Sequence, residues 1–170
     1  LFNLLSAPSR NIRLTLATGR TLTGVKPTLT QLGGIKKVPL VLYNGAVVVE
    51  PESEGVFART LIAKSSVDEI VRVVSLLRGV SLFLYAVDSD AKLVNDESTI
   101  EGVFYLGDLS RMPEKDFNGM PVKPYTEIRL STDEVVAALL TASSTEEKLR
   151  LSAALSDIPG ISITSSGSTY

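Results

Sequence analysis

The sequence predicts an α/β protein in which a parallel strand-helix-strand unit is followed by a mixed α+β region. A strand, a helix and further strands follow one another over residues 12–49, which is the order of a parallel unit. Two helices with their own start signals and several short strands follow after Pro51. Hydrophobic residues make up 44% of the 170 residues, which is ample material for a core.

A change in the spacing of apolar residues predicts the first strand and the helix that follows it. Apolar and polar residues alternate over 12–16, which is typical of a strand. After Arg20 the apolar residues recur at helical spacing, and Gly33-Gly34 is a typical helix end. Because Pro27 lies inside this segment, we expect the helix to begin late or to kink there.

More strands and a turn complete the first part. The apolar run over 38–43 predicts a strand that is buried on both faces. Asn44-Gly45 is a turn signal, and residues 46–49 form a further strand. The polar segment 50–55 then marks a boundary or a long turn, and 56–63 is again strand-like.

The two helices of the second part are predicted by capping boxes. Ser66 with Glu69 precedes one apolar stripe, and Ser144 with Glu147 precedes another. Residues 135–142 are mostly apolar and fit a helix or a strand. We predict a strand, because the helix that follows has its own start signal.

The other elements of the second part are short. Residues 97–124 are only weakly periodic, so no element is assigned to them. Strands are predicted at 81–87, at 91–94 as its hairpin partner, at 125–130 and at 161–164.

The composition excludes several kinds of chemistry. The chain contains no cysteine and no histidine, so disulfides, thiolate metal sites, cysteine nucleophiles and Ser-His-Asp triads are excluded. The net charge of −2 offers no electrostatic footprint for nucleic acid or for an anionic membrane. No apolar run approaches the ~20 residues of a membrane span, and a reducing cytoplasm is permitted.

A threonine, a glycine and an arginine follow the first predicted strand. At the carboxyl end of a parallel strand, the Thr18 hydroxyl and nearby backbone N–H groups can donate to a phosphate, and the next helix adds its N-terminus. Gly19 allows a close approach, and Arg20 can add a bidentate contact. The alternative is that Thr18 only caps the helix and Gly19 only serves a tight turn, and spacing alone favours this alternative.

Longer stretches show a resemblance to a family. The segment A-T-G-R at 17–20, then a helix, then Y-N-G-A at 43–46 resembles the Cof-type phosphatases of the haloacid dehalogenase superfamily. The stretch LFLYAVDSDAKLVND at 82–96 is similar to the hairpin of that family's cap domain. ISITSSGSTY at 161–170 is similar to the family's return from cap to core.

The resemblance implies a fold and an activity. The fold is a partial Rossmann-like core with an inserted α+β cap: residues 1–50 belong to the core, 51–164 form the cap, and 165–170 return to the core. The implied activity is Mg²⁺-dependent hydrolysis of phosphosugars or similar small phosphate monoesters through an aspartyl-phosphate, in the cytoplasm.

The resemblance also implies roles for four residues. In the family, a threonine at a strand end binds the transferring phosphoryl group, so Thr18 with Gly19 takes this role here. Arg20 and Asn44 are expected to border the site, as substrate-binding residues.

The sequence departs from the family at its catalytic motifs. The family's D-x-D-G-T motif lies before this threonine, and its lysine and metal-binding aspartates lie after the cap. We therefore expect no catalytic residue and no Mg²⁺ ligand in this chain, and no activity from the chain alone. Asp88 and Asp90 imitate D-x-D, but Ala91-Lys92 follows them where Gly-Thr is expected, so a solvated turn is favoured.

A second hypothesis is a non-catalytic binding or interaction domain that keeps only the fold. The expected partner is a small phosphorylated substrate, with neither nucleic acid nor membrane, and the oligomeric state is open.

The tyrosines of the predicted cap are expected to pack in the core, although cap side chains also set specificity. These residues are Tyr85, Tyr105 and Tyr125.

Overall fold

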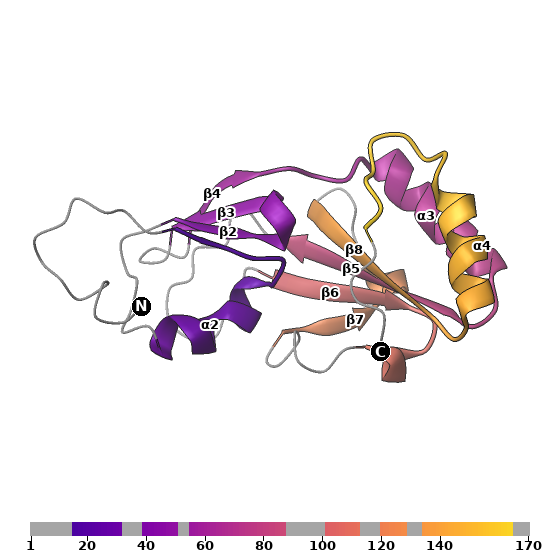
Figure 1. The fold of residues 1–170 in the computed structure, drawn as a ribbon, viewed down its shortest axis with the longest axis horizontal. Coiled ribbons are helices and arrows are strands. Elements are labelled where there is room, and N and C mark those ends of the chain that lie inside the picture. The colour runs from indigo at the N-terminus through magenta and orange to yellow at the C-terminus, as the bar shows by residue number, and fades with distance from the viewer. Residues whose placement is uncertain are drawn as a thin grey trace, which may run out of the picture.

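The computed structural model describes residues 15–31, 39–50, 55–87, 101–112, 120–128 and 134–164. Over these residues the chain forms two four-stranded sheets and three α-helices (Figure 1). The predicted fold class, α/β, is therefore confirmed. None of the helices in these ranges is long and apolar enough to cross a bilayer.

The first sheet begins with the predicted parallel unit. Strand β1 (Leu16–Ala17) pairs in parallel with β2 (Leu40–Leu42), and helix α2 (Leu22–Gln31) lies between them in sequence. Strand β3 (Val47–Glu50) pairs antiparallel with β2, and β4 (Gly55–Arg59) pairs antiparallel with β3. The sheet order is therefore β1-β2-β3-β4.

The turn after β2 has the conformation that Asn-Gly turns favour. The 3₁₀ turn η1 (Tyr43–Gly45) joins β2 to β3, and Asn44 has a left-handed φ of 56°. The predicted turn is thus confirmed. The domain boundary placed after residue 50 stays a prediction, but strand β4 lies beyond it and still pairs with β3.

The second sheet is built around one long strand. Strand β5 (Val80–Val87) pairs antiparallel with β6 (Glu101–Leu106) on one side and with β8 (Glu134–Ala142) on the other. The short strand β7 (Val122–Pro124) adds to β6 in parallel. The strands predicted over 81–87 and 135–142 are confirmed by β5 and β8.

Both faces of the second sheet are covered. Successive residues of β5 point to opposite faces, and each set packs in a different core. Phe83 and Tyr85 pack in a core with α2, β2 and β3, whereas Leu82 and Leu84 pack in a core with the other two helices. Those helices are α3 (Lys64–Leu76) and α4 (Thr145–Leu155), which lie together at one end of the molecule (Figure 1). The second sheet is thus the middle layer.

One predicted helix start is wrong and the other is confirmed. Helix α3 begins at Lys64, two residues before Ser66, and the Ser66 hydroxyl donates to the carbonyl oxygen of Pro159 at 3.0 Å. Glu69 pairs with Arg72 on the helix surface instead. In α4, the side chain of Ser144 accepts a hydrogen bond from the backbone N–H of Glu147, as predicted.

Two predicted strands are wrong, and the weakly periodic region 97–124 holds strands that the pattern does not predict. Residues 125–127 form a 3₁₀ turn, η4 (Tyr125–Glu127), after β7, so a strand over 125–130 is wrong. Residues 161–164 form no strand. Strand β6 lies in the weakly periodic region to which no element was assigned. The hairpin partner predicted at 91–94 and the acidic pair at 88 and 90 lie outside the described residues.

Candidate functional site

The candidate site begins in the loop between β1 and α2. The backbone N–H of Thr18 donates to the carbonyl oxygen of Val41 at 2.9 Å, which extends the parallel pairing by one residue. The hydroxyl oxygen of Thr18 accepts a hydrogen bond from the backbone N–H of Arg20 at 3.2 Å. Thr18 is half-buried, whereas Gly19 and Arg20 are exposed. The hydroxyl therefore closes the loop locally at the carboxyl end of β1.

This loop is held to the turn that follows β2. The N–H of Asn44 donates to the carbonyl oxygen of Thr18, and the N–H of Tyr43 donates to the carbonyl oxygen of Arg20, each at 3.2 Å. The carboxyl ends of two adjacent parallel strands thus meet at one edge of the sheet. Ligands of open α/β sheets bind at such edges.

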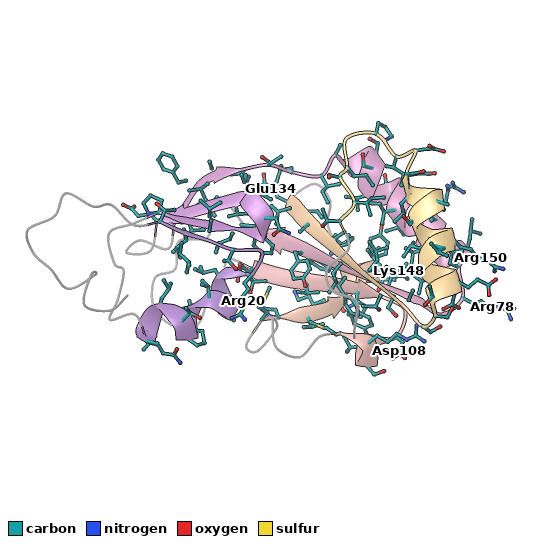
Figure 2. All side chains as sticks on the ribbon, viewed as in Figure 1. Arg20, Arg78, Asp108, Glu134, Lys148 and Arg150 are labelled. Carbon is teal, nitrogen blue, oxygen red and sulfur yellow. The ribbon has the colours of Figure 1, made fainter. Side chains whose placement is uncertain are left out.

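Gly19 and Asn44 lie in close contact. A Cβ atom built on Gly19 would lie 2.6 Å from Oδ1 of Asn44, so a side chain there would displace the amide. The structure therefore brings together all four predicted site residues: Thr18, Gly19, Arg20 and Asn44. Figure 2 shows Arg20 at the start of α2, well apart from Arg78 and Arg150, which lie at the end of the molecule that carries α4.

The cap of α2 is Thr21 and not Thr18. The hydroxyl oxygen of Thr21 accepts a hydrogen bond from the N–H of Gly24 at 2.8 Å, which is the contact between an N-cap residue and the third helical residue. The alternative in which Thr18 only caps the helix is therefore wrong. Thr21 directly precedes the first apolar residue of the helical pattern, Leu22, so this capping signal was available in the sequence.

The N-terminus of α2 is occupied by a carboxylate from the second sheet. The N–H groups of Leu22 and Thr23 donate to Glu101 Oε1 and Oε2 at 2.7 and 3.0 Å. From the sequence we expect this helix end to face a bound phosphate. These contacts correct that expectation, because the first N–H groups of α2 already donate to Glu101. No short-range pattern could reveal this contact, since 78 residues separate Thr23 from Glu101.

Tyr43 joins the same group of contacts. Its hydroxyl donates to Glu101 Oε1 at 2.7 Å, and its ring packs edge-on against Tyr85 with centroids 5.6 Å apart. Burial raises the pKa of Tyr43 well above its ordinary value, and the charge and hydrogen bond of Glu101 add to the effect. The phenol therefore stays protonated and acts as a donor.

The tyrosines predicted to pack in the core of the second part differ in exposure. Tyr85 is buried, and Tyr105 and Tyr125 are half-buried. Each packs against one of the two cores. The packing prediction is therefore confirmed for these side chains.

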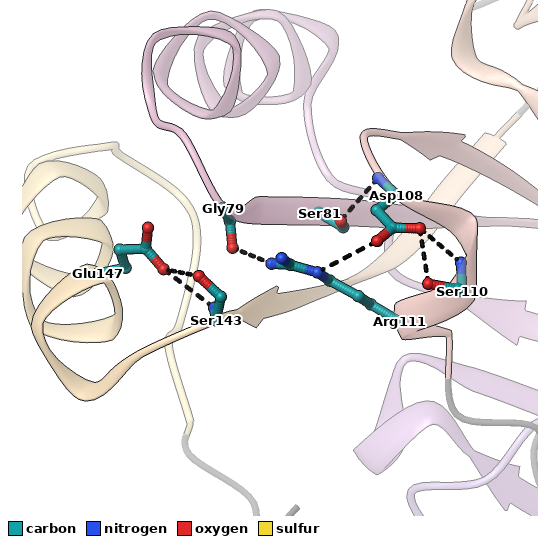
Figure 3. A network of polar contacts seen from close by, with 7 residues as sticks. All are labelled: Gly79, Ser81, Asp108, Ser110, Arg111, Ser143 and Glu147. Atoms are coloured by element: carbon teal, nitrogen blue, oxygen red, sulfur yellow. Dashed lines mark hydrogen bonds and ion pairs between the residues drawn. The ribbon is translucent and has the colours of Figure 1, made fainter.

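A second polar network lies at the other end of the second sheet (Figure 3). Arg111 donates to the carbonyl oxygen of Gly79 and lies 3.5 Å from Asp108, whose N–H donates to Ser81 Oγ at 2.9 Å. Hydrogen bonds from Ser110 lower the pKa of Asp108. These contacts fix the turn after β6 against the start of β5, which is a structural role.

The sequence pattern of the haloacid dehalogenase-like hydrolases matches residues 3–170. The chain belongs to this family. The predicted resemblance to phosphatases of the haloacid dehalogenase superfamily is thereby confirmed at the level of the family. A search of curated protein sequences finds no match.

Solved structures share the fold of this family member. A haloacid dehalogenase-like hydrolase from Bacteroides thetaiotaomicron matches with a TM-score of 0.64 and 17% identity, over 92% of this chain and 53% of that one. A sugar phosphatase of HAD subclass IIB matches with a TM-score of 0.54 and 15% identity, over 91% and 54%. A haloacid dehalogenase-like hydrolase from B. subtilis matches with a TM-score of 0.59 and 12% identity, over 86% and 55%. The chain spans about half the length of these structures.

The magnesium ion implied by the family does not fit the described residues. Across the ranges that the structure describes, no three histidine, cysteine, aspartate or glutamate side chains are grouped to hold a metal ion. The acidic side chain nearest in sequence to the turn after β2, Glu50, lies at the end of β3. The expectation that the Mg²⁺ ligands lie outside this chain stays a prediction.

Proposed function

We propose that this chain carries the phosphoryl-binding segment of a phosphatase that acts on phosphosugars or similar small phosphate monoesters. One observation supports the proposal above the others: the loop after β1 and the turn after β2 are hydrogen-bonded together at the carboxyl edge of the parallel pair. Residues 18–20 and Asn44 meet at this edge. Family membership and the sugar phosphatase among the similar structures support the same class of reaction.

The Thr18 hydroxyl is suited to bind a phosphoryl oxygen. A hydroxyl has one proton to donate and two lone pairs that accept. Its oxygen accepts from the N–H of Arg20, and this contact leaves the proton available for a ligand. A hydrogen bond to a charged phosphate is stronger than one between neutral groups.

The neighbours of Thr18 supply room and positive charge. Gly19 has no side chain, so a phosphate can approach the backbone closely. The Arg20 side chain is exposed and can form a bidentate contact with phosphate oxygens. The amide of Asn44, which lies against Gly19, has donors for the remaining substrate oxygens.

The chemical step needs groups beyond these four residues. Phosphoryl transfer in this family is expected to use an aspartate nucleophile from the D-x-D-G-T motif. We therefore propose that the segment described here binds and orients the phosphoryl group, while the nucleophile and the metal ligands come from residues other than the described ones.

The test is the turnover of a chromogenic phosphate ester with Mg²⁺, measured on this chain and on a chain joined to segments that carry the family's aspartate motifs. Turnover by the joined chain, with no turnover by this chain, supports the proposal. In that chain, Thr18→Ala should lower kcat/KM by about 10²-fold, as the loss of one donor to a phosphoryl oxygen implies, and Thr18→Ser should retain most activity.

The control is Thr30→Ala, since the Thr30 hydroxyl only donates to the carbonyl oxygen of Lys26 within α2. Unchanged kinetics in Thr18→Ala would contradict the role of Thr18. Phosphate binding without turnover in the joined chain would favour a non-catalytic binding domain.

A further inference from the structure

Glu101 is unusual among the described residues, because it alone is both charged and buried. Its side chain is 4% exposed, and the other buried polar side chains in these ranges belong to threonine and serine. A buried carboxylate is costly unless hydrogen bonds and opposite charge compensate for its lost hydration. The groups that surround Glu101 therefore indicate what it does.

Four donors to this carboxylate come from the first part of the fold. Thr23 contributes its backbone N–H and its hydroxyl, each 3.0 Å from Glu101 Oε2. Leu22 N–H and the Tyr43 hydroxyl both donate to Oε1 at 2.7 Å. The partial positive charge at the N-terminus of α2 adds to this stabilisation. One carboxylate on β6 thus joins the second sheet to both elements that follow the parallel strands.

These two elements hold the candidate phosphoryl-binding loop directly. The backbone N–H of Tyr43 donates to the carbonyl oxygen of Arg20 at 3.2 Å. The N–H of Arg20 in turn donates to the Thr18 hydroxyl oxygen. On the other side, α2 begins two residues after Arg20. A shift of Glu101 would therefore move both supports of Arg20.

We propose that Glu101 is a positioning residue that couples the docking of the second sheet to the geometry of the Thr18–Arg20 loop. This inference rests on the proposed function of that loop. In this role Glu101 does not contact the substrate. Glu101 acts through α2 and Tyr43, so phosphate affinity at the loop depends on a residue of the second sheet.

The test combines hydrogen exchange with calorimetry on the 170-residue chain. Glu101→Gln replaces the carboxylate with an uncharged group of the same shape. It should speed the exchange of the Leu22 and Thr23 amides by about tenfold or more, as the loss of charge-assisted hydrogen bonds implies. It should also weaken the binding of inorganic phosphate by about tenfold.

Two control variants separate positioning from general destabilisation. Ser144→Ala removes the cap of α4, which destabilises the second part without touching Glu101. Glu69→Gln removes an exposed negative charge that pairs with Arg72. Both should leave phosphate affinity and the exchange of the Leu22 amide unchanged.

The outcomes separate this inference from the proposed function. If the wild-type chain does not bind phosphate, the proposed function fails, while faster exchange in Glu101→Gln would still show the coupling to α2. If the wild type binds phosphate and a folded Glu101→Gln binds equally well, the positioning role is wrong. If Glu101→Gln does not fold, Tyr43→Phe removes one of the contacts and keeps the ring. Unchanged phosphate affinity in Tyr43→Phe would then overturn the inference.

Discussion

Gly19→Ala tests the contact between the two loops of the candidate site. An alanine Cβ would lie 2.6 Å from Asn44 Oδ1, 3.3 Å from its Cγ and 3.4 Å from its Nδ2. Ordinary contacts of a Cβ atom are 3.4 Å or longer. The overlap is therefore with one end of an exposed side chain, and Asn44 can rotate away.

The expected cost is that of moving one side chain from its preferred rotamer. Such a displacement costs about 0.5–1.5 kcal/mol. For a chain of this size, each kcal/mol lowers the melting temperature by about 2–4 °C. Asn44→Ala removes the overlapping atoms, so Gly19→Ala should cost almost nothing when Asn44 is already alanine.

A double-mutant cycle measures this coupling. The free energy of unfolding is determined by urea titration for the wild type, for each single variant and for the double variant. We expect a coupling energy of about 0.5–1.5 kcal/mol, equal to most of the cost of Gly19→Ala. The same cost of Gly19→Ala in both backgrounds would refute the placement of Asn44 against Gly19.

Three further predictions concern stability. Phe83 is fully buried and Phe57 is 80% exposed, so Phe83→Ala should cost about 3–5 kcal/mol in urea unfolding and Phe57→Ala less than about 0.5 kcal/mol. Gly107 and Gly160 both have positive φ, but only a Cβ on Gly107 would meet backbone, 2.9 Å from the Val80 carbonyl oxygen; Gly107→Ala should therefore lower the melting temperature more than Gly160→Ala. The pKa of Tyr43 is raised in the folded state, so its contribution to stability is complete below about pH 10, the ordinary tyrosine pKa, and falls as the pH rises above it. Urea unfolding at pH 9 and pH 11 should show a loss in the wild type that is smaller in Tyr43→Phe.

Elements with strong local signals could be predicted from the sequence. The N-cap at Ser144 decides where α4 begins, because its side chain accepts from the N–H of Glu147 only three residues further on. The turn at Asn44 is equally local, since asparagine tolerates the left-handed backbone that this turn requires. The four predicted site residues came together because parallel strands end at one edge.

Predictions failed where a distant contact decides the structure. Ser66 matches a capping box, but its hydroxyl bonds the carbonyl oxygen of Pro159, 93 residues away. Strand β6 has little periodicity of its own and is held by pairing with β5 and β7. The contact of Glu101 with the N-terminus of α2 could not be predicted either, since a carboxylate that caps a helix 78 residues away in sequence leaves no spacing pattern.

The central claim is that the Thr18 hydroxyl binds a phosphoryl oxygen at the end of β1. The most direct measurement is a titration of the ¹⁵N-labelled chain with inorganic phosphate, with the backbone amides of Gly19 and Arg20 followed by NMR. We predict saturable shifts at these two amides in the wild type and their loss in Thr18→Val, which keeps the shape of the side chain without the hydroxyl. Equal shifts in both proteins, or shifts confined to other parts of the chain, would contradict the claim.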